Sequence, residues 1–138
     1  APKDEAAMIK NRQGGNPLAQ VRPILTRNHL LNLQAMVAET YLSDSVIAYL
    51  VSLCAATRKS EDLSRGASPR ASLSMASMAK AIAQLRGRDF VVPGDVKEVF
   101  LPTIAHRVQL SPKAESQGKT VQQVLKAILD AIPAPRLR

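Results

Sequence analysis

The sequence predicts an all-α protein, a compact bundle of five or six helices. Of its 138 residues 46% are hydrophobic, but only 3% are aromatic, Trp is absent and Gly occurs six times. β-Sandwiches and barrels need more aromatic residues, more β-branched residues and more turns. In several segments apolar residues recur at helical spacing, and a Ser or Thr that can cap a helix precedes most of these segments.

The N-terminal part contains two predicted helices. Residues 2–12 carry acids in their first turn, and Gly14 and Gly15 are expected to stop this helix. A proline-containing, extended passage follows. Thr26 can then cap a second helix over residues 27–39, in which leucines recur at helical spacing.

The central part contains two longer predicted helices. Ser43 can cap a helix over residues 44–59, and a polar loop follows it. The next helix has the strongest start signal in the chain: the Ser68 side chain can accept a hydrogen bond from a free amide, and Pro69 stands where its missing N–H costs nothing. Gly87 is the expected C′ residue of this helix.

The C-terminal part contains the last two predicted helices. Residues 90–92 form an extended connector, and Pro93 opens a helix that Pro102 is expected to disturb. The polar composition of residues 111–119 predicts a loop. The last helix begins after Thr120.

Cysteine usage and hydropathy indicate the compartment. Cys54 is the only cysteine, which excludes an intramolecular disulfide and fits a reducing environment; on its apolar stretch it is expected to be buried. No run reaches the roughly 18 apolar residues of a membrane span, and the N-terminus has no signal-peptide core. We expect a cytoplasmic protein without a membrane partner.

The net charge of +8 suggests a polyanionic partner. A basic helical nucleic-acid-binding module is therefore one alternative function. The Lys and Arg residues are, however, scattered among acids, and a helix rich in base-reading side chains is absent, so the sequence favours this alternative less. A purely structural interaction domain is a further alternative.

Catalytic and metal-binding patterns are sparse. His29 and His106 lie in different predicted helices and lack suitably spaced carboxylates, so no metal site is predicted, and the sequence leaves the roles of both histidines open. Residues 118–120 (GKT) resemble the end of a P-loop, but Lys113 stands where that motif needs glycine. We expect no nucleotide hydrolysis by this chain alone.

Residues 66–71 (GASPRA) carry the most informative chemistry. The free amides and the positive dipole end of the predicted helix favour an anion, and Arg70 lies in the first turn beside them. A guanidinium there can bind two phosphate oxygens. The alternative is an ion pair between Arg70 and Glu61 or Asp62 in the preceding loop.

The chain resembles the C-terminal lid subdomain of MoxR-type AAA+ ATPases over about residues 17–135. The likeness rests on motifs in the same order: residues 56–58 (ATR), 66–71 (GASPRA), 87–93 (GRDFVVP), 95–96 (DV) and 106–107 (HR). It implies a helical lid domain over residues 17–138, preceded by an N-terminal helix or hinge segment over residues 1–16.

The resemblance also implies residue roles. Arg70 corresponds to the sensor 2 arginine, which reaches from the lid to the phosphates of ATP, and Ser68 and Pro69 belong to the same nucleotide-binding turn. Arg58 and Arg88 are weaker candidates with structural roles preferred, and for residues 106–107 packing against a neighbouring subdomain is preferred over nucleotide contact. The family's P-loop, Walker B acid, sensor 1 and arginine finger have no counterparts here.

The expected biology follows from the same resemblance. The parent protein would be an ATP hydrolase that uses ATP and Mg²⁺, with Mg²⁺ not bound by this chain. Family members typically form hexameric rings and act as chaperone-like maturation factors, often alongside von Willebrand factor A domain proteins. The expected partners are therefore the chain's own α/β ATPase core and neighbouring ring subunits.

Overall fold

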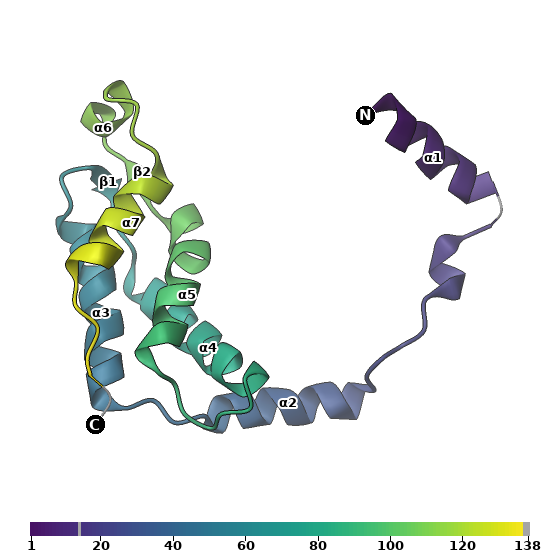
Figure 1. Cartoon of the computed structure of the whole chain (residues 1–138), viewed down its shortest axis with the longest axis horizontal. Helices are drawn as coiled ribbons and strands as arrows, with labels where there is room; N and C mark the ends of the chain where they lie inside the picture. The colour runs from purple at the N-terminus through teal and green to yellow at the C-terminus, as the bar shows by residue number, and fades with distance from the viewer. Residues whose placement is uncertain (14, 137–138) are drawn as a thin grey trace. The chain divides into compact units, whose positions relative to one another are not determined.

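The structure consists of helices and two very short strands (Figure 1). This computed structural model describes residues 1–13 and 15–136, and it divides into an N-terminal unit, Ala1–Asn32, and a C-terminal unit, Leu33–Arg138. The α-helices among the described residues are α1 (Pro2–Gln13), α2 (Arg27–Glu39), α3 (Asp44–Lys59), α4 (Pro69–Leu85), α5 (Pro93–Ile104), α6 (Pro112–Ser116) and α7 (Val121–Ala131). The all-α prediction is confirmed.

Helices α1 and α2 begin as the sequence predicts. No side chain of α1 is buried. The Thr26 hydroxyl accepts a hydrogen bond from the amide of His29 at 3.2 Å, which confirms the predicted cap of α2. The predicted helix stop at Gly14 lies outside the described residues, while the neighbouring Gly15 has a φ of 117°. A short 3-10 turn, η1 (Pro17–Gln20), occupies part of the expected extended passage.

The core of the C-terminal unit lies between α3, α4, α5 and α7 (Figure 1). Its largest fully buried apolar side chains are Phe100, Leu53, Met75, Ile104 and Leu125. These residues come from all four helices, so the core forms only when the helices assemble. Cys54 is buried among them as expected, its Sγ 3.6 Å from the Sδ of Met75, and burial raises the pKa of its thiol.

Helices α4 and α5 form the most extensive helix pair of the unit. The buried positions of α4 recur every four residues and three of the four are alanines: Ala71, Met75, Ala79 and Ala83. Small side chains in an i, i+4 row let two helix backbones approach closely. Pro102 does not break α5, which continues to Ile104.

Two short strands were not predicted. β1 (Leu63–Arg65) pairs antiparallel with β2 (Gln109–Leu110), and the Ser64 hydroxyl donates to the Leu110 carbonyl at 2.8 Å. The predicted connector 90–92 pairs with Tyr41: the Val91 amide donates to the Tyr41 carbonyl at 3.0 Å, and the Tyr41 amide donates to the neighbouring Asp89 carbonyl at 2.8 Å. Strands of two or three residues are too short to show alternating hydrophobicity, so periodicity cannot reveal them.

The prediction for Gly87 is confirmed, whereas the prediction for residues 111–119 is only partly correct. Gly87 follows α4 with a φ of 68°, which confirms it as the C′ residue. The predicted loop over residues 111–119 was partly wrong, because it contains α6. Ser111 caps this helix by accepting from the Ala114 amide at 3.3 Å, and Pro112 opens it. α6 raises the helix count above the predicted five or six.

Candidate functional site

The turn that precedes α4 packs directly on the C-terminal end of α3. A Cβ built on Gly66 would lie 2.5 Å from the Cα of Arg58 and 2.7 Å from the carbonyl carbon of Thr57. Real Cβ atoms do not approach backbone atoms this closely, so only glycine fits here. The two motifs 56–58 and 66–71 are therefore parts of one structural element.

Two side chains of α3 bind the backbone of this turn. The buried Thr57 hydroxyl accepts a hydrogen bond from the Ala67 amide at 2.8 Å and donates to the Cys54 carbonyl at 2.7 Å. The Arg58 guanidinium donates to the Ala67 carbonyl at 2.7 Å. Both polar groups of the Ala67 backbone are thus satisfied by α3. Arg58 therefore stabilises the turn that leads to Arg70, through a hydrogen bond to the backbone carbonyl of Ala67.

We expect Thr57→Val to destabilise the C-terminal unit by about 1–3 kcal/mol, because it leaves the buried Ala67 amide without its partner. Valine has nearly the same shape as threonine, so the loss reports the hydroxyl. Urea unfolding followed by circular dichroism measures it. Thr57→Ser keeps the hydroxyl and should retain most of the stability; an equal loss in both variants would contradict the assigned hydrogen bonds.

The helix start itself differs from the prediction in one respect. Ser68 is the N-cap residue of α4 and has the extended backbone expected of a cap, with φ −74° and ψ 164°, and Pro69 opens the helix. The predicted capping bond was wrong, because the Ser68 side chain makes none. The first-turn amides of α4 are therefore not occupied by their own cap side chain.

Arg70 is exposed on the first turn of α4. None of the ion pairs among the described residues includes it. Asp62, one of the two acids proposed as alternative partners, is held instead by the Lys119 ammonium at 2.7 and 2.8 Å. The Arg70 guanidinium is thus available to a ligand or to another protein surface.

Arg88 lies at the other end of α4 and binds a buried acid. Its two terminal nitrogens donate to the Asp95 carboxylate at 2.8 and 2.7 Å, and its guanidinium lies 5.9 Å from the Phe90 ring centre. Arg70 lies in the first turn of α4 and this cluster follows its last turn, so the helix separates them by roughly 22 Å. The structure therefore brings Arg58 toward the Arg70 turn but leaves Arg88 far from it.

Asp95 is the centre of this second cluster. Its carboxylate is fully buried and also accepts from Arg86 at 3.1 Å and from the Val92 amide at 2.9 Å. Burial by itself raises the pKa of Asp95, but the Arg88 hydrogen bonds, the Val92 amide and the charges of Arg88 and Arg86 outweigh it, so the pKa lies below its ordinary value. Asp95 therefore remains ionised at neutral pH.

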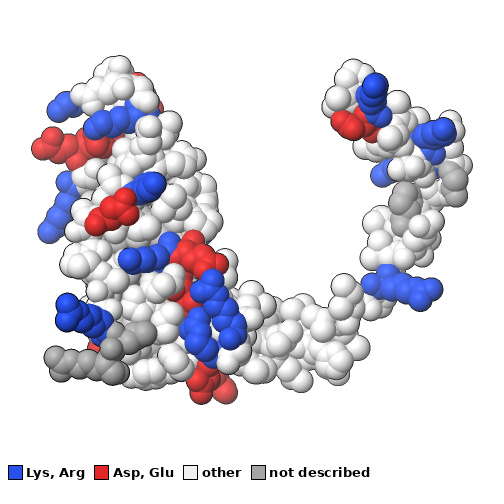
Figure 2. Space-filling view, viewed as in Figure 1, with Lys and Arg blue, Asp and Glu red and all other residues white. Residues whose placement is uncertain are grey.

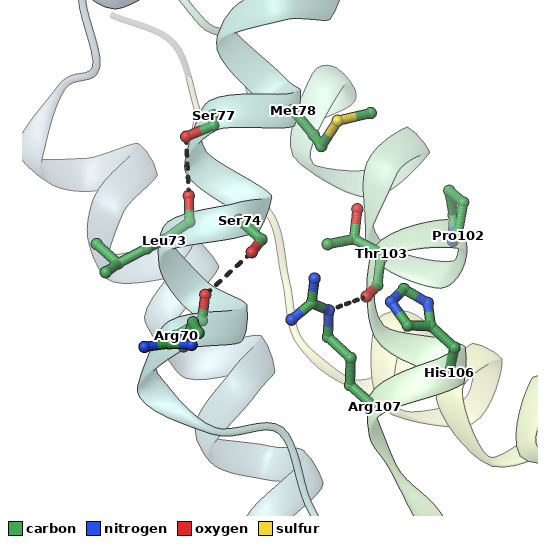
Figure 3. Close-up of a pocket in the computed structure, with 9 residues that line it drawn as sticks. All are labelled: Arg70, Leu73, Ser74, Ser77, Met78, Pro102, Thr103, His106 and Arg107. Carbon is green, nitrogen blue, oxygen red and sulfur yellow. Dashed lines mark hydrogen bonds between the residues drawn. The ribbon is translucent and has the colours of Figure 1, made fainter.

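A groove runs beside Arg70 between α4 and the end of α5 (Figure 3). It has a volume of about 540 Å³. One wall comes from α4 and the other from α5 and the 3-10 turn η2 (Ala105–Arg107). The lining residues are Arg70, Leu73, Ser74, Ser77, Met78, Pro102, Thr103, His106 and Arg107. The groove thus joins Arg70 to residues 106–107, which the sequence places 36 positions later.

The two histidines occupy different surroundings. His106 lines the groove, whereas His29 lies exposed on α2 in the N-terminal unit. In the described part of the chain, no group of three or more His, Cys, Asp or Glu residues could hold a metal ion. Over the same residues, no helix combines the length and the apolar character that crossing a bilayer requires.

Sequence reasoning missed the groove and the role of Thr57. The sequence did carry one signal for Thr57: it continues the apolar face of the predicted helix 44–59, where a hydroxyl needs a backbone partner. The groove had no sequence signal, because its walls come from segments that are distant along the chain.

Known proteins are similar to this chain in the part that contains the Arg70 turn and the groove. The family described as "AAA lid domain" matches residues 55–128, slightly more than half of the chain. The crystal structure of a predicted ATPase from Cytophaga hutchinsonii superposes with a TM-score of 0.79 at 27% identity, covering 97% of this chain and 44% of that one.

Among curated proteins, the Chaperone MoxR1 of Mycobacterium tuberculosis is 34% identical over 99% of this chain and 38% of its own length. Protein MoxR of Paracoccus denitrificans is 31% identical over 98% of this chain and 45% of its own length. The uncharacterised protein YeaC of Bacillus subtilis is 27% identical over 96% of this chain and 41% of its own length. The chain therefore spans less than half the length of these relatives.

Proposed function

Because the chain belongs to the AAA lid domain family and is a lid of the MoxR type, we propose that it supplies Arg70 as the sensor 2 residue of an ATP-hydrolysing protein. The observation that carries the proposal is the placement of Arg70: an exposed guanidinium without an ion-pair partner among the described residues, on the first turn of a long helix. The cap side chain makes no hydrogen bond to this turn, although the Ala71 amide donates to the Ser68 carbonyl at 2.9 Å. A permanent cation beside such amides suits phosphate oxygens.

The residues around Arg70 fit ATP as the cofactor. ATP, when bound, supplies a terminal phosphate whose charge must be stabilised during transfer. Arg70 would bind the phosphate oxygens, while Thr57 and Arg58 hold the preceding turn in place. No carboxylate lines the groove in the described residues, so the proposal assigns Mg²⁺ to the ATPase core rather than to this chain.

A lid that binds the terminal phosphate also responds to its loss. The C-terminal unit has one core shared by four helices, so it can move as one body when Arg70 loses its anion. We therefore propose that the motion of this unit drives chaperone-like remodelling. From the family resemblance we further propose that the lid spans residues 17–138 and that residues 1–16 belong to the segment leading into it. The proposed setting is a hexameric cytoplasmic ring, with von Willebrand factor A domain proteins as partners.

The charge distribution does not favour the nucleic-acid alternative. On the face of the C-terminal unit shown in Figure 2, Lys and Arg side chains alternate with Asp and Glu side chains. Several described cations are already engaged by acids: Arg86 and Arg88 by Asp95, and Lys119 by Asp62. A duplex-binding surface requires a continuous row of cations free to face phosphates.

The test is Arg70→Ala in the ATPase that combines this lid with its core. We expect turnover to fall by roughly 10- to 100-fold, because one charge-assisted donor to the phosphates is lost. ATP affinity should fall more than ADP affinity. The melting temperature should not change, since the Arg70 side chain is exposed and makes no ion pair in the described structure.

Lys97→Ala is the matched control, because Lys97 is an exposed cation of the same unit outside the groove. It should leave turnover unaltered. Unchanged turnover in Arg70→Ala would remove Arg70 from the mechanism and would contradict the proposed function.

A further inference from the structure

Resting on the proposed function, we infer that Arg107 is a second phosphate-binding arginine of the same site. It faces the groove from η2, opposite the wall formed by α4 (Figure 3). The sequence placed it with His106 in a packing role. The structure instead places it beside the groove that begins at Arg70.

Arg107 is held in place by its own segment. Its Nε donates to the Thr103 carbonyl at 3.1 Å, and Thr103 is buried. This bond orients the guanidinium plane and leaves the two terminal nitrogens for another acceptor. Because Arg107 is only partly exposed, it loses less conformational freedom on binding a ligand than a fully exposed arginine would.

Two arginines and no acid line the groove in the described part of the chain. Arg70 comes from α4 and Arg107 from η2. None of the ion pairs of the described chain involves Arg107. Two permanent guanidinium charges without a neighbouring acid give this groove a positive potential. The arrangement is therefore complementary to an anion.

Two other hydroxyl groups of the groove, those of Ser74 and Ser77, already donate their hydrogens within α4. The Ser74 hydroxyl donates its hydrogen to the Arg70 carbonyl at 3.1 Å, and the Ser77 hydroxyl donates to the Leu73 carbonyl at 3.2 Å (Figure 3). Neither serine hydroxyl therefore has a hydrogen left to donate to a bound anion. The arginines are left as the principal donors toward a bound anion.

A polyphosphate suits this arrangement better than a carboxylate. A carboxylate has two oxygens, which one guanidinium fork already occupies. A chain of phosphates has oxygens pointing in several directions, so arginines on two walls can each bind a different pair. We therefore assign the di- and triphosphate part of the nucleotide to Arg70 and Arg107 together.

The experiment compares Arg107→Ala, Arg107→Lys, Arg70→Ala and Lys97→Ala in the lid-containing ATPase. Dissociation constants are measured for ATPγS, ADP and AMP, together with kcat and the melting temperature. We expect Arg107→Ala to weaken ATPγS and ADP about tenfold and AMP less than twofold. The melting temperature should fall only slightly, because one hydrogen bond to the Thr103 carbonyl is lost. Arg107→Lys should recover part of the loss, and Lys97→Ala should match the wild type.

Two results would overturn the assignment of Arg107. Unchanged ATPγS and ADP affinity in Arg107→Ala, with a loss in Arg70→Ala, would remove Arg107 from the phosphate site and leave the proposed function intact. An equal loss for all three nucleotides together with a markedly lower melting temperature would assign it a structural role. If Arg70→Ala also leaves nucleotide affinity and turnover unaltered, the proposed function itself fails.

Discussion

Replacing Gly66 with alanine is expected to destabilise the C-terminal unit by about 2–4 kcal/mol. The added methyl group would overlap the α3 backbone at Thr57 and Arg58, at distances of 2.5–2.7 Å. A helix backbone cannot yield as the end of a flexible side chain can. Moving the turn away instead would break both hydrogen bonds of α3 to the Ala67 backbone.

Urea unfolding of the 138-residue chain measures this loss, and a fall in melting temperature of roughly 10 °C or more should accompany it. Gly94→Ala is the matched control. Gly94 lies in the first turn of α5, and its nearest neighbour would be a Val92 methyl at 3.9 Å. This control should be neutral or slightly stabilising, because alanine favours helix. Equal stability of Gly66→Ala and the wild type would contradict the close approach of the two segments.

The Asp95→Asn substitution is expected to destabilise the same unit by about 2–3 kcal/mol at pH 7. The amide is uncharged and cannot serve both Arg86 and Arg88 as a carboxylate does. The substitution also removes the negative charge of the carboxylate that accepts a hydrogen bond from the Val92 amide at the start of α5. Arg88 would be left partly buried without its counterion.

The pH dependence of stability should single out the same carboxylate. The pKa of Asp95 is lower in the folded state than its ordinary value near 4, so its charge stabilises the fold fully above that value. This contribution is lost as the pH falls below about 4 and then passes the lower pKa of the folded state, where Asp95 becomes protonated.

The free-energy difference between the wild type and Asp95→Asn should therefore shrink between pH 7 and pH 3, as measured by urea unfolding. Asp130→Asn is the control, because Asp130 is exposed and forms no ion pair in the described structure. A difference that stays constant over this pH range would show that the charge of Asp95 does not stabilise the fold.

The helices could be predicted because their signals are local. Thr26, Ser43 and Gly87 each act within one turn of their own helix, and the structure confirms all three. Local signals failed where a segment was short or its partner distant. The strands β1 and β2 are too short for a period, and α6 lies in a segment whose polar composition resembles a loop.

The candidate site could be predicted in part. Residues 66–71 were recognised as a helix start carrying an arginine, because Ser, Pro and Arg act within the same turn. The partners of that turn on α3 and the facing Arg107 could not be predicted, because they depend on how α3, α4 and α5 pack. The predicted Ser68 capping bond was wrong, since a suitable residue type does not fix the rotamer of its side chain.

The amino-acid sequence by itself determined an all-α chain, the start of α4 and the exposed cation of its first turn, since capping, proline geometry and helical periodicity act over a few residues. Only the tertiary structure decided that Gly66 rests on α3, that Asp95 is buried between two arginines, and that Arg70 and Arg107 border one groove. Those relations depend on side-chain packing between helices, and the distance between two segments in space is not encoded in the pattern of either one.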